Sequence, residues 1–254
     1  MEARAVHEDD GGAGRGLSPG GEADLVQEQD GTLSGRRDNL GGVRGPAVAR
    51  DRLEASVDGV LTRRTSPDYA ATFFMPNDGP ASAHTNLAVA RFMCGDVRGG
   101  DAQIDAARRR CETIEFPRGP FSTAQAESHA AWMQIERGDM VAAGAAASVV
   151  ADVADRHGFD LWALIGATEL ASIEGLSALD PRPGDNAALI AHAEVLEGLC
   201  AMWTAVDLAP FLPFYMATAG RLRAASGDSE GAADWYGKTL QFAGTTGIHF
   251  YDAE

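Results

Sequence analysis

Apolar residues over the last two thirds of the chain recur with the spacing of one helix face. One stripe runs from Ile104 to Ile114 in steps of three and four residues, and a second runs in the same way from Leu189 to Trp203. The sequence has no alternating apolar and polar run of similar length, which a half-buried strand would show. The pattern predicts helices and no sheet, with approximate bounds of 80–94, 97–115, 120–137, 140–157, 159–178, 186–206, 210–226 and 229–246.

The dipeptide Gly-Asp recurs four times at a nearly constant spacing. Its glycines stand at positions 95, 138, 184 and 227, which are 43, 46 and 43 residues apart. Glycine readily adopts the left-handed conformation that ends a helix, and the aspartate side chain accepts a hydrogen bond from the next helix. A second set of positions is in phase with the first: Phe116, Phe159, Leu208 and Phe250. The sequence therefore repeats a helix hairpin of about 44 residues, and the segment ALDPRPGDN lengthens the third copy.

Helix hairpins of constant length stack into an α-solenoid, because each hairpin covers its apolar stripe with the next one. The predicted fold class is all-α: a right-handed, tetratricopeptide-like (TPR-like) α-solenoid of about four hairpins, with a disordered N-terminal segment. Residues 1–65 are predicted to be disordered or of low complexity, since the first 50 contain 11 glycines and few aliphatic residues, although 51–64 could form a short helix. Residues 66–79 are predicted to be a linker, and residues 80–254 the helical-repeat domain.

The last hairpin of this domain is predicted to be incomplete. Gly247 should end the helix over 229–246, and only a short stub follows it. An apolar stripe on that helix consists of Ala233, Tyr236, Leu240 and Ala243. Because an uncovered stripe would meet water, we expect this end to fray or to be covered by self-association.

The acidic balance of the chain argues against a nucleic-acid partner. Its 254 residues include 37 acidic and 21 basic side chains, for a formal net charge of −16, which repels phosphate backbones. The sequence has no uninterrupted apolar run of roughly 18 residues and no secretory signal at its start. We therefore expect a cytoplasmic protein with no membrane or nucleic-acid partner, whose three cysteines are reduced thiols.

Residues that could support catalysis do not fall into a recognisable arrangement. A nucleotide-binding P-loop needs G-x-x-x-x-G-K-[ST] between a strand and a helix, whereas Gly237-Lys238-Thr239 lies within a predicted helix and follows an alanine at position 232. The histidines are not in an H-E-x-x-H arrangement, and the cysteines are not at metal-ligand spacing. We therefore predict a protein that is not an enzyme, with no catalytic residue, cofactor or metal.

Aromatic residues offer a candidate contact surface. The segment PFLPFY places Phe211, Phe214 and Tyr215 at the start of a predicted helix, and Trp132 and Trp162 lie on two earlier helices, where they could line a ligand groove. The alternatives are that the tryptophans fill gaps between helix layers and that PFLPFY is a packed helix start with proline in its first turn.

A run of three arginines, residues 108–110, is the other concentrated chemical feature. It faces Asp101 and Asp105 at helical spacings of three and four, so most of its charge is predicted to be neutralised along one helix face. The alternative is an arginine contact to a nucleotide or to RNA.

Several segments carry a resemblance to a known family. SAHTNLAVARFMCGD, FPRGPFSTAQAESHAAWMQIERGD, ADRHGFDLWALIGATE and TTGIHFYDAE resemble the TPR-like C-terminal region of large bacterial signalling proteins. Those proteins carry a class III adenylate cyclase domain or a LuxR-type regulator fused to an ATPase domain. The resemblance covers about residues 73–254. The classical tetratricopeptide signature, with a period of about 34 residues, is absent from this chain.

The resemblance implies a non-catalytic regulatory or interaction module that binds a protein partner or a small effector. Two alternatives stay open. The chain could be a remnant of a larger adenylate cyclase or transcriptional regulator gene with no independent activity, or it could be a nucleotide-processing enzyme.

Overall fold

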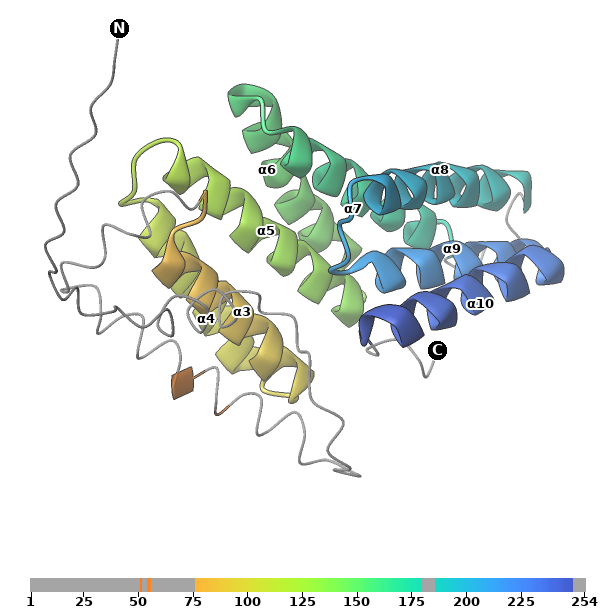
Figure 1. Ribbon diagram of the computed structural model, residues 1–254, viewed down its shortest axis with the longest axis horizontal. Coiled ribbons are helices and arrows are strands. Elements are labelled where there is room, and N and C mark those ends of the chain that lie inside the picture. Colours follow the sequence, from red (N-terminus) through yellow and green to blue (C-terminus); the bar gives the residue numbers. More distant parts are fainter. Residues whose placement is uncertain (1–50, 52–53, 56–75, 180–185, 249–254) are drawn as a thin grey trace, which may run out of the picture. The chain divides into compact units, whose positions relative to one another are not determined.

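The computed structural model describes residues 51, 54–55, 76–179 and 186–248, and Figure 1 shows the helices among them. The chain divides into two units, Met1–Thr32 and Leu33–Glu254, and the described residues belong to the second. Over these residues the protein is all-helical and has no strand, as predicted. The helices are α3 Gly79–Met93, α4 Val97–Cys111, α5 Arg118–Arg137, α6 Met140–His157, α7 Asp160–Ser177, α8 Asn186–Ala205, α9 Leu212–Ser226 and α10 Ser229–Thr246.

Most helix ends lie close to their predicted positions, and the largest difference is at the end of α4. This helix ends at Cys111, whereas the prediction extended it to residue 115. The amides of Thr113 and Ile114 donate to carbonyl groups three residues earlier, both at 3.1 Å. This tightening of the last turn, together with Pro117 shortly after it, ends the helix early.

Three of the four Gly-Asp dipeptides are described, and each joins two helices as predicted. Their glycines have φ values between 77° and 88°, in the left-handed region. The side chain of each following aspartate accepts a hydrogen bond from the backbone N–H three residues later, at 2.9 Å in every case. The fourth dipeptide, at residues 184–185, lies outside the described residues.

Neighbouring helices pack against each other in chain order from α3 to α10, and the odd-numbered helices also contact one another. Thus α5 packs on α3 and α7, and α9 packs on α7. The packing is uneven within the third hairpin, because α7 packs more extensively on α6 than on α8, while α8 packs mainly on α9. In Figure 1, α8, α9 and α10 lie side by side.

Small residues let helices approach closely in the core. Helices α5 and α6 bury a series of alanines against each other, including Ala131 and Ala147. A Cβ added at Gly175 of α7 would lie 2.7 Å from a methyl group of the buried Leu222 on α9. Close contact of α7 with α9 therefore requires glycine at position 175.

Little of the segment before α3 is described. Asp51, Glu54 and Ala55 are helical, so the disorder predicted for residues 1–65 does not extend to these three residues. Glu54 accepts two hydrogen bonds from Arg91 of α3, the shorter at 2.8 Å. This ion pair links Glu54 to α3. The rest of residues 1–65 and most of the predicted linker lie outside the described residues, as does the end of the chain from residue 249.

None of the described helices combines the length and the apolar composition that crossing a bilayer requires.

Candidate interaction groove

The aromatic residues predicted to form a contact surface lie mainly in the core. Trp132, Trp162, Phe214 and Tyr215 are buried, and Phe211 is half-buried. The prediction of an exposed aromatic surface is therefore wrong for four of these five residues. The two alternatives are confirmed: the tryptophans fill gaps between helices, and PFLPFY is a packed start of α9 with proline in its first turn.

Ring contacts explain why these side chains are inside. Trp132 of α5 meets the ring of Phe92 at 5.6 Å between centroids and that of Phe211 at 5.3 Å. Tyr215 of α9 meets Trp203 of α8 at 5.0 Å. Such edge and tilted contacts add to the gain from burying a large apolar surface.

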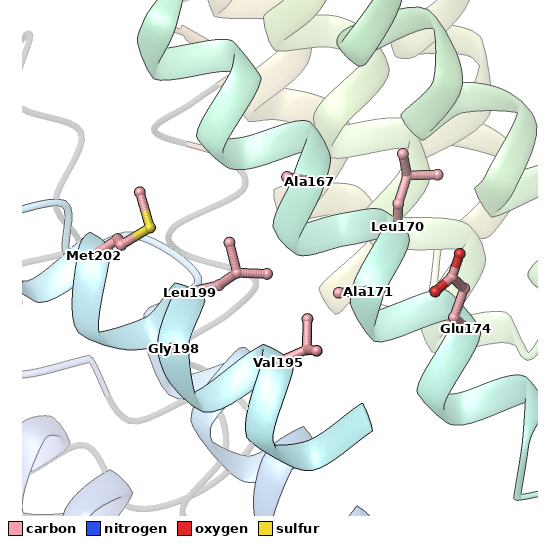
Figure 2. Close-up of a pocket in the computed structure, with 8 residues that line it drawn as sticks. All are labelled: Ala167, Leu170, Ala171, Glu174, Val195, Gly198, Leu199 and Met202. Carbon is pink, nitrogen blue, oxygen red and sulfur yellow. The ribbon is translucent and has the colours of Figure 1, made fainter. Parts of the chain in front are cut away.

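An open groove lies instead between α7 and α8, in the third hairpin. It has a volume of about 570 Å³, and Figure 2 shows side chains of both helices around it. Val195 and Met202 of α8 remain 56% and 53% exposed, so the structure leaves apolar surface uncovered here. The lining residues are Ala167, Leu170, Ala171, Glu174, Val195, Gly198, Leu199 and Met202.

Small residues and a long connection account for the groove. Ala167 and Ala171 on α7 and Gly198 on α8 do not reach across the gap, and a Cβ built at Gly198 would meet nothing within 4 Å. The insertion ALDPRPGDN lengthens the connection between the two helices. Since α8 packs mainly on α9, its outer face stays open toward α7.

The charge at the groove is negative. Glu174 is the one charged side chain among the described lining residues, and Figure 2 places it at the end of the groove away from Met202. Its carboxylate is exposed and has no ion pair or hydrogen bond within the described part of the chain. Glu194, also exposed, lies one helical turn before Gly198 on α8. Both carboxylates could accept hydrogen bonds from a basic partner.

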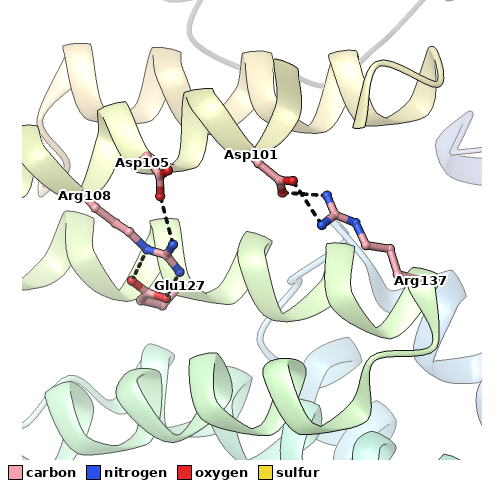
Figure 3. Close-up of polar contacts among 5 residues, drawn as sticks. All are labelled: Asp101, Asp105, Arg108, Glu127 and Arg137. Atoms are coloured by element: carbon pink, nitrogen blue, oxygen red, sulfur yellow. Dashed lines mark hydrogen bonds and ion pairs between the residues drawn. The ribbon is translucent and has the colours of Figure 1, made fainter. Parts of the chain in front are cut away.

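A second gap, between α4 and α5, is closed by charges of the chain itself. It has a volume of about 260 Å³. Figure 3 shows Arg108 of α4 donating to both oxygens of Glu127 on α5, each at 2.7 Å, and to Asp105 at 3.3 Å. Arg137 donates to Asp101 across the same gap, at 2.6 and 3.3 Å. The charged side chains that line this gap are therefore ion-paired within the chain, although the buried Nε of Arg137 has no acceptor among the described residues.

Two of the three arginines at residues 108–110 are paired, in line with the prediction for most of the run, but with a different set of partners, and Arg109 is exposed with no ion pair among the described residues. Arg108 does pair with Asp105, whereas Asp101 pairs with Arg137. Arg110 instead binds the buried carboxylate of Asp78, at 3.0 Å to each oxygen. The hydrogen bonds to Glu127 raise the pKa of Arg108 above its usual range.

The groove lining includes neither of the two buried thiols, Cys111 and Cys200, nor the exposed Lys238. Burial raises the pKa of the Cys111 thiol to about 11 and that of Cys200 to about 12, so neither is a thiolate at neutral pH. Lys238 lies in the middle of α10, where it pairs with Asp234 at 2.6 Å. Within the described residues, no group of three or more His, Cys, Asp or Glu side chains is placed to hold a metal ion.

Glu169 on α7 is buried without a cation. Ser128 of α5 donates to one of its oxygens at 2.6 Å, and the other oxygen has no hydrogen-bond partner among the described residues. Burial raises the pKa of this carboxyl well above its usual range, although the hydrogen bond from Ser128 opposes the shift. Burial therefore disfavours the charged form of this carboxyl in the folded protein.

Comparison with known proteins adds no relative to this description. No family model, curated protein or solved structure matches the chain.

The sequence contains a signal for the groove that its main periodicity conceals. Helix α8 carries a buried stripe from Leu189 to Trp203, and Val195 and Met202 add exposed apolar positions on another side. A surface helix normally has one apolar stripe facing the core. These added positions mark the face that the chain leaves uncovered.

Proposed function

We propose that this protein is a non-catalytic helical-repeat module that binds a partner in the groove between α7 and α8. The observation that supports the proposal most directly is the open apolar surface at Val195 and Met202. Burial of such side chains by a partner contributes about 1 kcal/mol or more each. A groove of this kind, rimmed by a free carboxylate, is typical of a protein-interaction site.

The fold proposed for the module is a right-handed, TPR-like α-solenoid of four hairpins. The order of helix packing supports it, because each hairpin contacts the next and the odd-numbered helices contact one another in sequence. The repeated Gly-Asp junctions support it as well, since they impose the same helix-to-helix connection in successive units.

The resemblance of residues 73–254 to the C-terminal region of bacterial cyclase and LuxR-type regulators supports a regulatory setting for this interaction. We propose a cytoplasmic protein whose partner is another protein. Self-association through α10 is a second proposal, supported by the exposure of Leu240 and Ala233. The other two residues of the predicted C-terminal stripe are covered, since Ala243 is buried and Tyr236 half-buried.

Site-specific photocrosslinking in the native host tests the interaction. A photoreactive amino acid at position 202, in the groove, is compared with the same residue at Met93, an exposed methionine on α3. We expect one protein to crosslink strongly from position 202 and weakly from position 93. Equal yields from both positions would contradict the groove as the binding site, and absence of any crosslink would favour a remnant without independent activity.

The enzyme alternative has its own measurement. Lys238 is the chain's one lysine, and it is held by Asp234 and lies 4.6 Å from the centre of the Trp235 ring. We expect purified protein to turn over neither ATP nor GTP. Turnover that Lys238→Ala abolishes would overturn the proposal that the protein is non-catalytic.

A further inference from the structure

We infer that the occupant of the groove is an amphipathic helix of another protein, apolar over about two turns and carrying an arginine or lysine that pairs with Glu174. This inference rests on the proposed function and adds the chemistry and orientation of the partner. Three features of the groove support it: its walls, its length and its charge.

The walls favour a helix over an extended peptide. Both are α-helices, whose backbone N–H and C=O groups are already paired within each helix, so they cannot add a strand from a partner. The groove also presents one charged group and little other polar chemistry, which is a poor match for a small polar effector. A helix lying along two helices needs apolar contacts of the kind that these walls provide.

The length of the groove determines how many apolar side chains a partner helix can place in it. Its lining residues extend from Ala167 to Glu174 on α7 and from Val195 to Met202 on α8. Seven residues of helix advance by about 10 Å, or roughly two turns. A partner helix can therefore place apolar side chains at i, i+4 and i+7 against Leu170, Leu199 and Met202, whose flexible thioether adapts to different side chains.

Charge then selects and orients this helix. Glu174 has no cationic partner within the described part of the chain, and Glu194 adds a second exposed carboxylate on the facing helix. A basic residue at the Glu174 end forms an exposed ion pair of modest energy but clear directional preference. A second copy of this chain is a poorer occupant of the groove than a basic partner, because Glu174 and Glu194 would face a chain with a net charge of −16.

The chain also contains a segment of similar composition, DRLEASVDGVLTRR at residues 51–64. Glu54 within it is bound to Arg91 of α3, and α3 packs on α4 and α5. These contacts favour an occupant from another protein over this segment.

The inference is tested by fluorescence anisotropy with a labelled model peptide and the full chain. The peptide is a helix of about 14 residues with leucine at i, i+4 and i+7 and arginine one turn further on, and a second peptide has glutamate in place of arginine. We expect wild-type protein to bind the arginine peptide, and Glu174→Lys to weaken that binding roughly tenfold while strengthening binding of the glutamate peptide. Asp155→Lys, at an exposed aspartate on α6, controls for the general change in charge.

A pair of isosteric double variants separates this inference from the proposed function. The groove variant is Val195→Thr with Met202→Gln, and the control variant is Val141→Thr with Met93→Gln, at exposed positions on α6 and α3. We expect the groove variant to bind the arginine peptide at least about tenfold more weakly than wild type, and the control variant to bind it as wild type does.

Each remaining outcome decides between the two claims. If the groove variant binds the peptide as the control does, both the groove and its partner are wrong. If it loses binding but Glu174→Lys behaves like Asp155→Lys, the groove stands and the basic partner is wrong. If wild-type chain binds no peptide until Val57 and Leu61 are changed to aspartate, the chain's own segment occupies the groove, and the inferred partner is overturned.

Discussion

The gap between α4 and α5 and the groove between α7 and α8 are both spaces between neighbouring helices, yet they are completed in opposite ways. In the first, arginines of each wall reach carboxylates of the other, as Arg108 reaches Glu127 and Arg137 reaches Asp101 (Figure 3). In the second, both walls are apolar and Glu174 has no cation among the described residues (Figure 2). The described residues fill and pair the α4–α5 gap but leave the α7–α8 groove open. A partner is therefore expected at the groove.

Two buried glutamates differ in the same way, one with a cationic partner and one without. Ionisation of the second gives the largest expected change in the free energy of unfolding. Glu127 has an arginine partner, whereas Glu169 has a serine, and burial raises the pKa of Glu169 well above its usual range. An unfolded glutamate loses its proton near pH 4.3, so the free energy of unfolding should fall as pH rises above that value, by at most about 1.4 kcal/mol per pH unit. Below that pH both states are protonated, and the effect vanishes.

The measurement is chemical denaturation of wild type and Glu169→Gln between pH 5 and pH 8. Glutamine keeps an acceptor for Ser128 and cannot ionise, so the variant should lose most of this slope and gain on wild type as pH rises. Parallel pH profiles would show that Glu169 is ionised in the folded protein or has a partner that offsets its charge.

Removing one glutamate from each space tests the comparison directly. Glu127→Ala removes the partner of Arg108 across the α4–α5 gap and leaves it with Asp105 of its own helix. We expect a loss of about 2 kcal/mol, reduced from the buried-pair value because Arg108 is partly exposed. Glu174→Ala breaks no contact among the described residues and should change the free energy of unfolding by less than about 0.5 kcal/mol. Urea denaturation measures both. Equal losses would mean that Glu174 also has an internal structural role.

Alanine substitution at two glycines of the third hairpin should change the stability of the protein in opposite directions. At Gly198, on the floor of the groove, an added methyl meets open space, so Gly198→Ala should stabilise the protein by about 0.5 to 1 kcal/mol through helix propensity. At Gly175 the same methyl meets the buried Leu222 at 2.7 Å, and a net loss of about 1 to 2 kcal/mol is expected. Thermal denaturation distinguishes the two. Stabilisation at both positions would mean that α7 and α9 are less closely packed than described.

The smallest change in the free energy of unfolding is expected for the groove variant, Val195→Thr with Met202→Gln. Both side chains are more than half exposed, so the variant should keep the stability of wild type within about 0.5 kcal/mol. Its circular dichroism and urea midpoint provide the check. A large loss of stability would show that these residues support the fold, and the binding comparison would then need Glu174→Lys as its main variant.

Helix positions could be predicted from the sequence because they depend on local features. The step of three and four between Ile104 and Ile114 places a stripe on one face, and the Gly-Asp junctions end one helix and begin the next. The end of α4 was missed because its last turn tightens over Thr113 and Ile114, which the periodicity does not show.

The groove could not be predicted because it depends on which stripe is covered after packing. Aromatic residues such as Trp132 and Tyr215 suggested a surface, but neighbouring helices supply rings that enclose them. The added apolar positions on the other side of α8 were present in the sequence, yet their exposure follows from the packing of α8 on α9. Likewise, the pairing of Arg137 with Asp101 joins residues 36 positions apart and has no local signature.

The chain-order packing of the helices also has a consequence for synthesis on the ribosome. Each helix from α4 to α10 packs on the helix before it, so loops between contacting segments are short and their closure costs little entropy. A nascent chain can thus fold hairpin by hairpin as it emerges, at synthesis speeds of about 5 to 20 residues per second. The groove is lined by α7 and α8 alone, so its formation during synthesis does not require α10.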